Sequence, residues 1–198
     1  MFSRVRATGI LFIIGLGVLA GQAQTATDKP LSQNPDAVKE YNKALEVGNK
    51  GDTKTAEAGY RKAIKLDPNF ALAHNNLGSM LMDRGDIAGA ETSYQAAIQA
   101  DPKLQLARLN LGSVQVDQKK FDEAVQTLDQ LIAMIGVPAA NVAPESASLG
   151  ALLGGKTPTD AADVTAPLND TQKAKAFYLR GLAQAGLGHH PDAVLDYR

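Results

Sequence analysis

Between residues 71 and 100, apolar residues recur three and four positions apart in two stretches, 71–84 and 87–100. That spacing places them on one face of an α-helix, so each stretch is predicted to be helical. Gly85 and Asp86 separate the stretches, and this pair suits a tight turn followed by a cap on the next helix. Pro102 ends the second stretch, because proline disfavours helical geometry in the residue before it. The pattern predicts two helices joined by a tight turn.

The same pattern recurs with a period of 34 residues. Three blocks superimpose at this spacing: residues 37–70, 71–104 and 105–138. The residues that match between blocks are Asn42, Asn76 and Asn110; Ala56, Ala90 and Ala124; Tyr60 and Tyr94; Asp67-Pro68 and Asp101-Pro102; and Gly78 and Gly112. Because one helix pair cannot bury its apolar faces alone, successive pairs must stack. The expected fold is an all-α solenoid of antiparallel helix pairs, in which Gly78 and Ala90 let paired helices approach closely.

Residues 77–102 resemble the tetratricopeptide repeat (TPR). They read L-G-x-x-L…G-D-x-x-x-A-x-x-x-Y-x-x-A-I-x-x-D-P, and the residues in family positions are Leu77, Gly78, Ala90, Tyr94, Ala97 and Pro102. His74 replaces the aromatic residue that is usual early in the first helix. The resemblance implies a right-handed superhelix whose first helices line a concave face.

The regular pattern breaks after the third block. Residues 136–170 are rich in Gly, Pro and Ala, and Pro144 and Pro158 would fall inside the helices of a further repeat. This stretch is interpreted as an irregular insertion with one short helix near 145–153. A helical pattern resumes at 172–187, so residues 171–198 are expected to form a partial fourth repeat.

The first 23 residues are interpreted as a cleaved secretory signal. Arg4 and Arg6 precede twelve apolar residues, 9–20, and small residues follow at the spacing that a signal peptidase reads. As a helix, the apolar stretch would reach about 18 Å, short of the roughly 30 Å hydrocarbon core of a bilayer. The alternative is an uncleaved membrane anchor. The bacterial style of the sequence makes the periplasm or the outside of the cell the expected location.

Residues 24–34 are polar and are interpreted as a leader before the repeats. Asn34 can accept a hydrogen bond from a free backbone N–H, and Pro35 suits the first position of a helix. The first helix is therefore expected to begin directly after Asn34.

The composition of the chain excludes several classes of function and disfavours a β fold. The 198 residues carry a net charge of −1, which gives no basic surface for nucleic acid. The sequence has no Cys, which excludes disulfides, thiolate nucleophiles and Cys-ligated metals. It also has no Trp and only 5 Phe and 5 Tyr, which favours helices packed through small residues over a β-sandwich.

Three features that could suggest chemistry are interpreted as structural. Residues 150–157 match the P-loop pattern letter for letter, but no apolar strand precedes them and Pro158 follows directly, so no nucleotide is expected. His189 and His190 lie in an expected turn without a third ligand, so no metal or other cofactor is expected. His74 is expected to be a core or half-buried residue on the packing face of a helix. Without a catalytic constellation, the chain is not expected to be an enzyme.

The candidate site is the concave face that the resemblance implies. Its candidate peptide-binding residues are Asn42, Asn76, Asn110, Tyr41, Leu45, Asn75, Ser79, Met82, Leu109 and Ser113. An amide side chain offers both a donor and an acceptor, so one Asn per repeat can pair with a peptide backbone of any sequence. This row resembles the asparagine ladder of the O-linked N-acetylglucosamine transferases. The alternative is that Asn is simply common at this position in the family.

The leading functional hypothesis is a non-catalytic scaffold that binds a segment of another cell-envelope protein in the concave groove. The alternative is the substrate-recruiting N-terminal part of a longer envelope enzyme, a peptidase or glycosyltransferase, because the chain stops abruptly at Arg198. A further hypothesis is self-association through the open C-terminal end, where Leu182 and Leu195 would be uncovered. Neither nucleic acid nor nucleotide is expected as a partner, and the sequence does not specify which protein is bound.

Overall fold

The computed structural model describes residues 32–136 and 167–189, which form seven α-helices and no β-strand. The helices are α1 (Pro35–Asn49), α2 (Thr53–Leu66), α3 (Ala71–Asp83), α4 (Ile87–Ala100), α5 (Gln105–Asp117), α6 (Phe121–Ile135) and α9 (Asp170–Gly186). The expected all-α fold is confirmed. The second block shows how closely the helix boundaries agree: α4 has the predicted bounds, and α3 ends one residue earlier than predicted.

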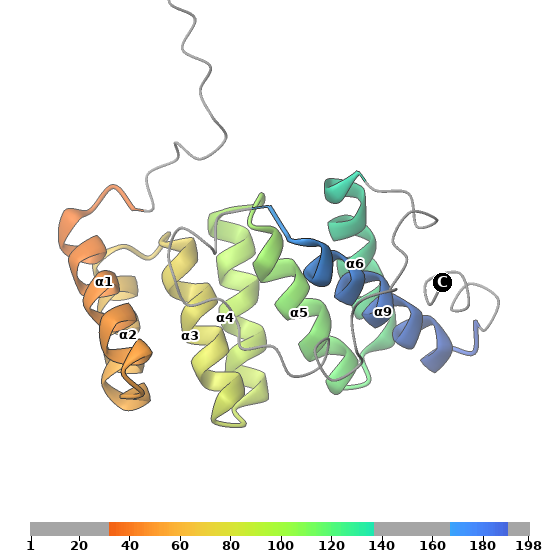
Figure 1. Ribbon diagram of the computed structural model, residues 1–198, viewed down its shortest axis with the longest axis horizontal. Coiled ribbons are helices and arrows are strands. Elements are labelled where there is room, and N and C mark those ends of the chain that lie inside the picture. Colours follow the sequence, from red (N-terminus) through yellow and green to blue (C-terminus); the bar gives the residue numbers. More distant parts are fainter. Residues whose placement is uncertain (1–31, 137–166, 190–198) are drawn as a thin grey trace, which may run out of the picture.

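The helices pack as stacked pairs. α1 packs on α2, α3 on α4 and α5 on α6, and short turns join the two helices of each pair. Adjacent pairs meet where α2 packs on α3 and α4 packs on α5. Figure 1 shows the helices following one another in chain order along the longest axis, from α1 to α9. The expected stacking of helix pairs is confirmed.

Four helices begin at a side-chain cap, namely α1, α2, α4 and α9. Asn34 accepts hydrogen bonds from two backbone N–H groups of α1, at 3.0 and 3.3 Å. Asp52 and Asp86 each accept one at 3.0 Å, at the starts of α2 and α4. Asn169 does the same for α9, at 2.9 Å. Each cap satisfies an N–H group that has no partner inside its helix, which fixes where the helix begins.

Small residues allow the paired helices to approach closely. A Cβ atom on Gly78 of α3 would lie 2.7 Å from the ring of Tyr94 on α4. A Cβ atom on Gly112 of α5 would lie 2.6 Å from Leu128 on α6. In the first pair the small residue is on the second helix, where Gly59 of α2 faces α1. The role expected of Gly78 is therefore confirmed, and the first pair achieves the same approach from the opposite side.

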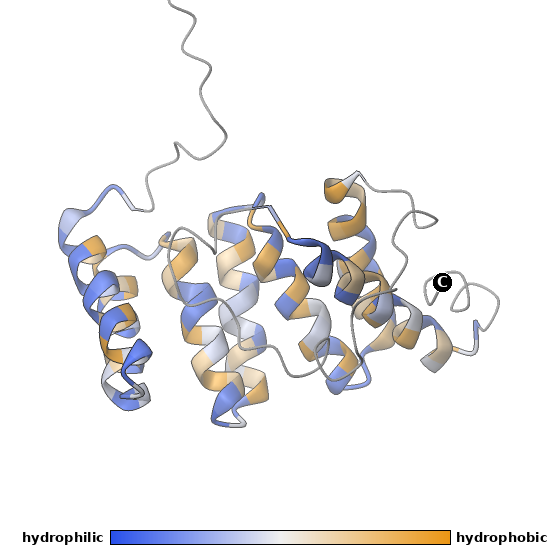
Figure 2. Ribbon diagram, viewed as in Figure 1, coloured by the Kyte–Doolittle hydropathy of each residue, from blue (hydrophilic) through white to orange (hydrophobic). Residues whose placement is uncertain are grey.

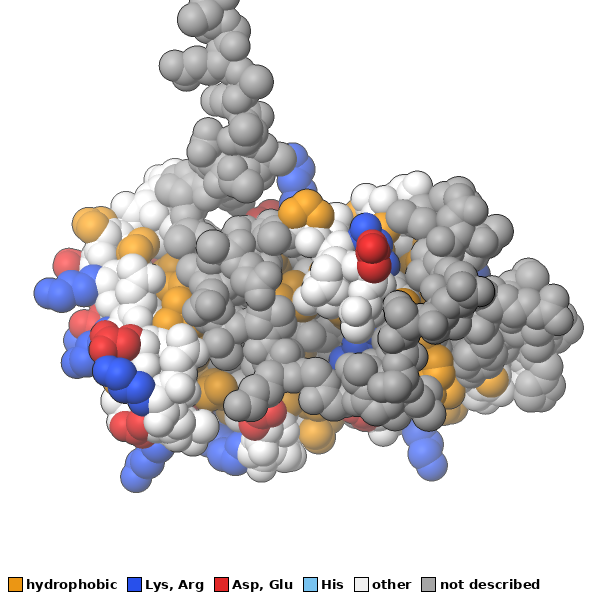
Figure 3. All heavy atoms as spheres, in the orientation of Figure 1, with side chains coloured by type: hydrophobic (Ala, Val, Ile, Leu, Met, Phe, Trp, Pro, Cys, Tyr) orange, Lys and Arg blue, Asp and Glu red, His pale blue; other side chains and the backbone are white. Residues whose placement is uncertain are grey.

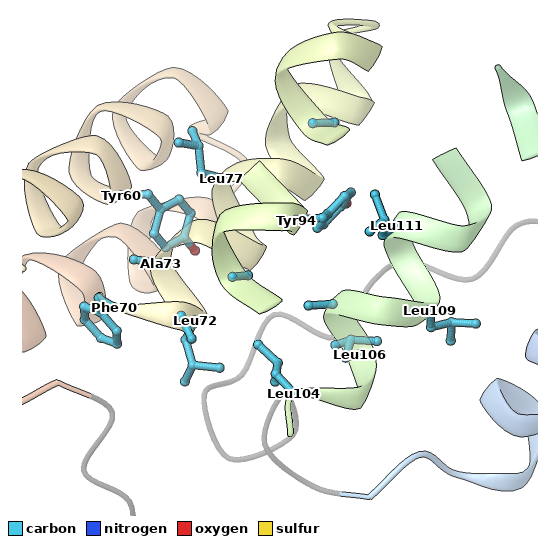
Figure 4. Close-up of a cluster of buried hydrophobic side chains, with 14 of the residues drawn as sticks. Tyr60, Phe70, Leu72, Ala73, Leu77, Tyr94, Leu104, Leu106, Leu109 and Leu111 are labelled. Carbon is cyan, nitrogen blue, oxygen red and sulfur yellow. The ribbon is translucent and has the colours of Figure 1, made fainter. Parts of the chain in front are cut away.

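One apolar core runs through the whole array. Figure 4 shows part of it, from Tyr60 and Phe70 to Leu109 and Leu111. Tyr41 also belongs to it, with its ring centroid 4.8 Å from that of Phe70. Figure 2 shows apolar residues on every helix, interleaved with hydrophilic ones, as expected when each helix buries only one face.

Helix α9 continues the array after a long gap in the described chain. It packs on α6, and also on α5, as the first helix of a fourth repeat would. The N-terminal segment 1–23, the short helix expected near 145–153 and residues 190–198 of the expected fourth repeat all lie outside the described residues. Among the helices that are described, none is both long enough and apolar enough to cross a bilayer.

Candidate protein-binding site

The ten candidate binding residues lie on α1, α3 and α5, which are the first helices of the three full repeats. Met82 and Ser113 are half-buried, and Asn42 is exposed. The buried members are Tyr41, Leu45, Asn75, Asn76, Ser79, Leu109 and Asn110. The structure thus places the candidates on corresponding helices, but few of their side chains are open to solvent. Their role in binding a peptide stays a prediction.

The asparagines bond to one another and to a tyrosine. The Nδ2 of Asn110 donates to the Oδ1 of Asn75 at 3.2 Å. The Nδ2 of Asn75 in turn donates to the Oδ1 of Asn76, also at 3.2 Å. The Nδ2 of Asn76 then donates to the Tyr41 hydroxyl at 3.1 Å. These four side chains, which we call the amide chain, connect α5, α3 and α1. Three of the four amide groups expected to face a peptide are therefore already hydrogen-bonded inside the array, and the fourth, that of Asn42, is exposed.

Hydroxyl groups of the second helices border the amide chain. The Ser79 Oγ lies 3.2 Å from the Tyr94 hydroxyl and donates to the backbone carbonyl of Asn75 at 3.3 Å. Burial raises the pKa of Tyr94 to about 12, although the hydrogen bond with Ser79 opposes this shift. Burial also raises the pKa of Tyr60, against the effect of its hydrogen bond with Asn76. Both phenols therefore stay protonated at neutral pH and can donate to their neighbours.

Besides Asn42 in the middle of α1, an accessible part of this face lies toward the C-terminal ends of α3 and α5. Met82 of α3 and Val116 of α5 stand one repeat apart, and both are half-buried against the core. Asp83 and Asp117 follow them directly in the sequence, and both are exposed. We call these four residues the exposed strip. It combines apolar contact area with negative charge and repeats from one unit to the next.

Helix α9 brings a positive charge near this strip. Desolvation raises the pKa of the Asp117 carboxyl, and the charge of Lys175 on α9 opposes that shift. Desolvation also lowers the pKa of the Lys175 amine, and Asp117 opposes that shift in turn. The charges of Asp117 and Lys175 therefore stabilise each other.

The structure also shows ion pairs between repeats that sequence reasoning missed. Glu57 of α2 accepts from Arg84 at 2.8 Å, and Glu91 of α4 accepts from Lys120 at 2.8 Å. Each pair links a second helix to the turn of the following repeat. Glu57 and Glu91 are one period apart, which is the signal that could have revealed them. Figure 3 shows other charged side chains gathered at the α1–α2 end of the face in view.

The histidines have structural positions. His74 is half-buried, as expected, and its Nε2 lies 2.9 Å from the backbone carbonyl oxygen of Pro68. Arg108 takes the same position one repeat later and donates to the backbone carbonyl of Pro102. His189 is exposed, whereas His190 lies outside the described residues. Within residues 32–136 and 167–189, no group of three His, Cys, Asp or Glu side chains is placed to hold a metal ion.

Solved structures share this fold at low sequence identity. A double mutant of MamA RS-1 aligns with a TM-score of 0.59 and 18% identity, over 82% of this chain and 71% of that chain. MamA from residue 41 to its end, from Desulfovibrio magneticus RS-1, gives a TM-score of 0.58 at 18% identity, over 82% and 72%. PilF from Pseudomonas aeruginosa gives 0.53 at 19% identity, over 80% of this chain and 58% of that chain. Such similarity shows the fold alone.

Family models identify the repeats themselves. One model described as a tetratricopeptide repeat matches residues 41–105, and a second with the same description matches residues 81–136. No curated protein sequence matches the chain significantly. The matched residues include the helix pairs, the glycine contacts and the recurring Asp-Pro ends described above. Residues 41–136 of this chain are therefore similar to tetratricopeptide repeats, and the described helices form a TPR-like array of stacked pairs.

Proposed function

We propose that this protein is a non-catalytic scaffold that binds a segment of another protein along the first helices of its repeats. Tetratricopeptide repeats typically mediate contacts between proteins and are typically non-catalytic. The observation that carries the proposal is the exposed strip, in which Met82 and Val116 offer apolar contacts beside Asp83 and Asp117. Recurrence at one repeat spacing suits an extended partner that makes the same contact more than once.

The proposal keeps Met82 from the predicted set of binding residues and adds Val116, which stands one repeat later. Asn75, Asn76 and Asn110 are buried and bonded to one another, so a partner would have to replace existing hydrogen bonds to reach them. A partner would meet no such cost at Met82, which is half-buried and apolar. We therefore place the first contacts at Met82 and Val116 rather than at the asparagine row.

We propose further that the protein is exported and that its partner lies in the cell envelope. The support is the sequence of residues 1–23, with Arg4 and Arg6 ahead of the apolar stretch 9–20. N-terminal sequencing of the protein purified from its native host tests this proposal. A first residue close to position 24 is expected, and retention of Met1 would contradict it.

Site-specific photo-crosslinking tests the binding surface. A photo-reactive amino acid replaces Met82 in one variant and Val116 in another, in the full-length protein expressed in its native host. Two control variants carry it at Thr92 on α4 and Gln126 on α6, which are both exposed. The same partner segment is expected from positions 82 and 116 and not from the controls. Equal capture at Thr92 and Gln126 would remove the strip as the binding surface, and capture of the chain itself would favour self-association.

A further inference from the structure

The amide chain passes through the interior of the array. Asn75 is 1% exposed, Asn76 is 5% exposed and Asn110 is 8% exposed, while Tyr41 is completely buried. Two of its three hydrogen bonds cross between repeats: Asn76 to Tyr41, and Asn110 to Asn75. The third, between Asn75 and Asn76, joins them within α3. The result is a continuous polar connection from the first repeat to the third.

A simple positional rule describes this connection. Counted from Ala37, Ala71 and Gln105, the fifth residue of one repeat receives the hydrogen bond donated by the sixth residue of the next. Asn42 is the sixth residue of the first repeat and is exposed, and within residues 32–136 no earlier repeat precedes it. Its exposure, compared with the burial of Asn76 and Asn110, shows that burial follows the contact between repeats and not the residue type.

The rule changes at the third junction, which joins the third repeat to α9. There the residues at both positions are apolar. The fifth residue of the third repeat is Leu109, and aligning Gly181 with Gly112 places Leu179 of α9 at the sixth position. Leu109 is 2% exposed and Leu179 is 3% exposed, and both belong to the apolar core. Polar residues therefore meet polar residues at two junctions, and apolar residues occupy the matching positions at the third.

We propose that the amide chain couples the first three repeats into one cooperative folding unit, and that α9 lies outside it. In repeat arrays, cooperativity depends on the free energy of the interface between neighbours. A buried amide that loses its partner is costly, because it cannot recover that hydrogen bond from water. Separating one repeat from the next would break such a hydrogen bond and expose both partners to water, so the bond adds its net free energy to that interface. The asparagine row thus serves the stacking of repeats, a role independent of the proposed partner.

Helix α9 lacks this form of coupling. Its junction with α6 combines apolar contacts with an ion pair between Arg180 and Asp129, at 2.9 Å, and the Asp129 side chain is 52% exposed. An ion pair with so exposed a carboxylate is screened by water and salt. Opening α9 would therefore break no hydrogen bond of the amide chain. Local opening of α9 is expected at a lower free energy than opening of α1.

A double-mutant cycle tests the coupling. The variants are Asn75→Leu, Asn110→Leu and the double variant, which copies the leucine pair of the third junction. Asn75→Leu leaves Asn110 and Asn76 each without one hydrogen-bond partner, and Asn110→Leu leaves Asn75 without one, so each single substitution is expected to lower the urea midpoint. The two single losses in urea midpoint, added together, give the loss expected without coupling. The double variant is expected to lose no more than half of that sum. If the urea midpoint of the double variant falls by the full sum of the two single losses, the proposal is overturned. Asn42→Ala, at the exposed position of the same row, is the control and should leave the midpoint unchanged.

Hydrogen exchange of the wild-type full chain tests the same proposal without substitutions. Backbone amides of α1, α3 and α5 are expected to exchange through the same opening of the array. Their exchange rates should therefore change with urea concentration in the same way. Amides of α9 are expected to exchange at least tenfold faster, through a smaller opening. If amides of α1 open separately from those of α3, the first three repeats are not one unit and the proposal fails.

Discussion

At the scale of single residues, the turn between paired helices contains one residue with left-handed backbone geometry. Gly51 and Gly85 hold this position in the first two repeats, with φ of 88° and 84°. Lys119 holds it in the third repeat, with φ of 59°. A residue with a Cβ is strained in this conformation, whereas glycine adopts it freely. The third turn is therefore the least favourable of the three.

Lys119→Gly is expected to stabilise the protein by about 0.5–1 kcal/mol. The gain from relieving the strain exceeds the cost of the extra freedom that glycine has in the unfolded chain. Urea denaturation measures the difference. Gln118→Gly is the control, because Gln118 has a φ of −80° and gains nothing from glycine. A Lys119→Gly variant no more stable than the wild type would show that this turn is not strained.

Tyr94 makes stability depend on alkaline pH. Its pKa is about 12 in the folded protein, above the ordinary value of 10.0, because burial disfavours the phenolate. The full stabilisation is present below about pH 10 and is lost as the pH rises from 10 to 12, because the unfolded chain releases its proton first. The loss is about 2–3 kcal/mol. Stability measured from pH 9 to 12 should therefore fall more steeply for the wild type than for Tyr94→Phe; parallel curves would contradict this cause.

At the scale of elements, pairing depends on contacts where a side chain of one helix meets the backbone of the other. The ring of Tyr94 from α4 packs against Gly78 on α3, and the side chain of Leu128 from α6 packs against Gly112 on α5. The period places each glycine and its large partner at the same positions in both repeats, so the sequence predicts where the contact is made. Only the stacked structure shows that these large partners are almost completely buried and cannot move aside.

Gly78→Ala is expected to destabilise the protein by about 1–3 kcal/mol, although alanine is the better helix former. The added Cβ would overlap the Tyr94 ring, and relieving the overlap would separate α3 from α4. Thermal unfolding measures the effect. Gly48→Ala is the matched control on α1, because its nearest neighbour is the Ala56 Cβ at 3.3 Å. If both variants have the same stability, close approach at Gly78 is not what fixes the pair.

Sequence reasoning failed at the element scale where polar side chains meet between repeats. The partners in Asn76–Tyr41 and Asn110–Asn75 are 35 residues apart, one more than the period, so comparing equivalent positions does not pair them. The asparagine row was visible in the sequence, but its hydrogen-bond partners depend on how far neighbouring helices are offset when they stack. The amides were therefore expected to face a ligand, whereas in the structure they bond inside the array.

At the scale of the whole molecule, the array continues across a long separation in sequence. Four residues, 101–104, join α4 to α5, whereas 34 residues, 136–169, separate α6 from α9. Yet α9 packs on α6, as α5 packs on α4. The contact surfaces of the helices, rather than the length of the connection, determine which helices become neighbours, since a longer loop adds only slowly to the entropy of closure.

Replacement of residues 137–166 by a Gly-Ser linker of about eight residues is expected to leave the seven helices and their stacking intact, because α6 and α9 are already in contact. Far-UV circular dichroism and thermal unfolding measure the result, with a chain that also lacks α9 as the comparison. A shortened chain that unfolds like the one without α9 would show that the replaced residues are needed for docking this helix.

The sequence by itself determined the helices, their ends and the stacking of pairs, because capping residues, apolar periodicity and small residues act over short distances along the chain. Only the stacked structure shows which polar groups are satisfied inside the array and which part of the candidate site is accessible. Those outcomes depend on the distance and offset between helices far apart in sequence, since hydrogen bonding and burial are set by what a neighbouring repeat presents.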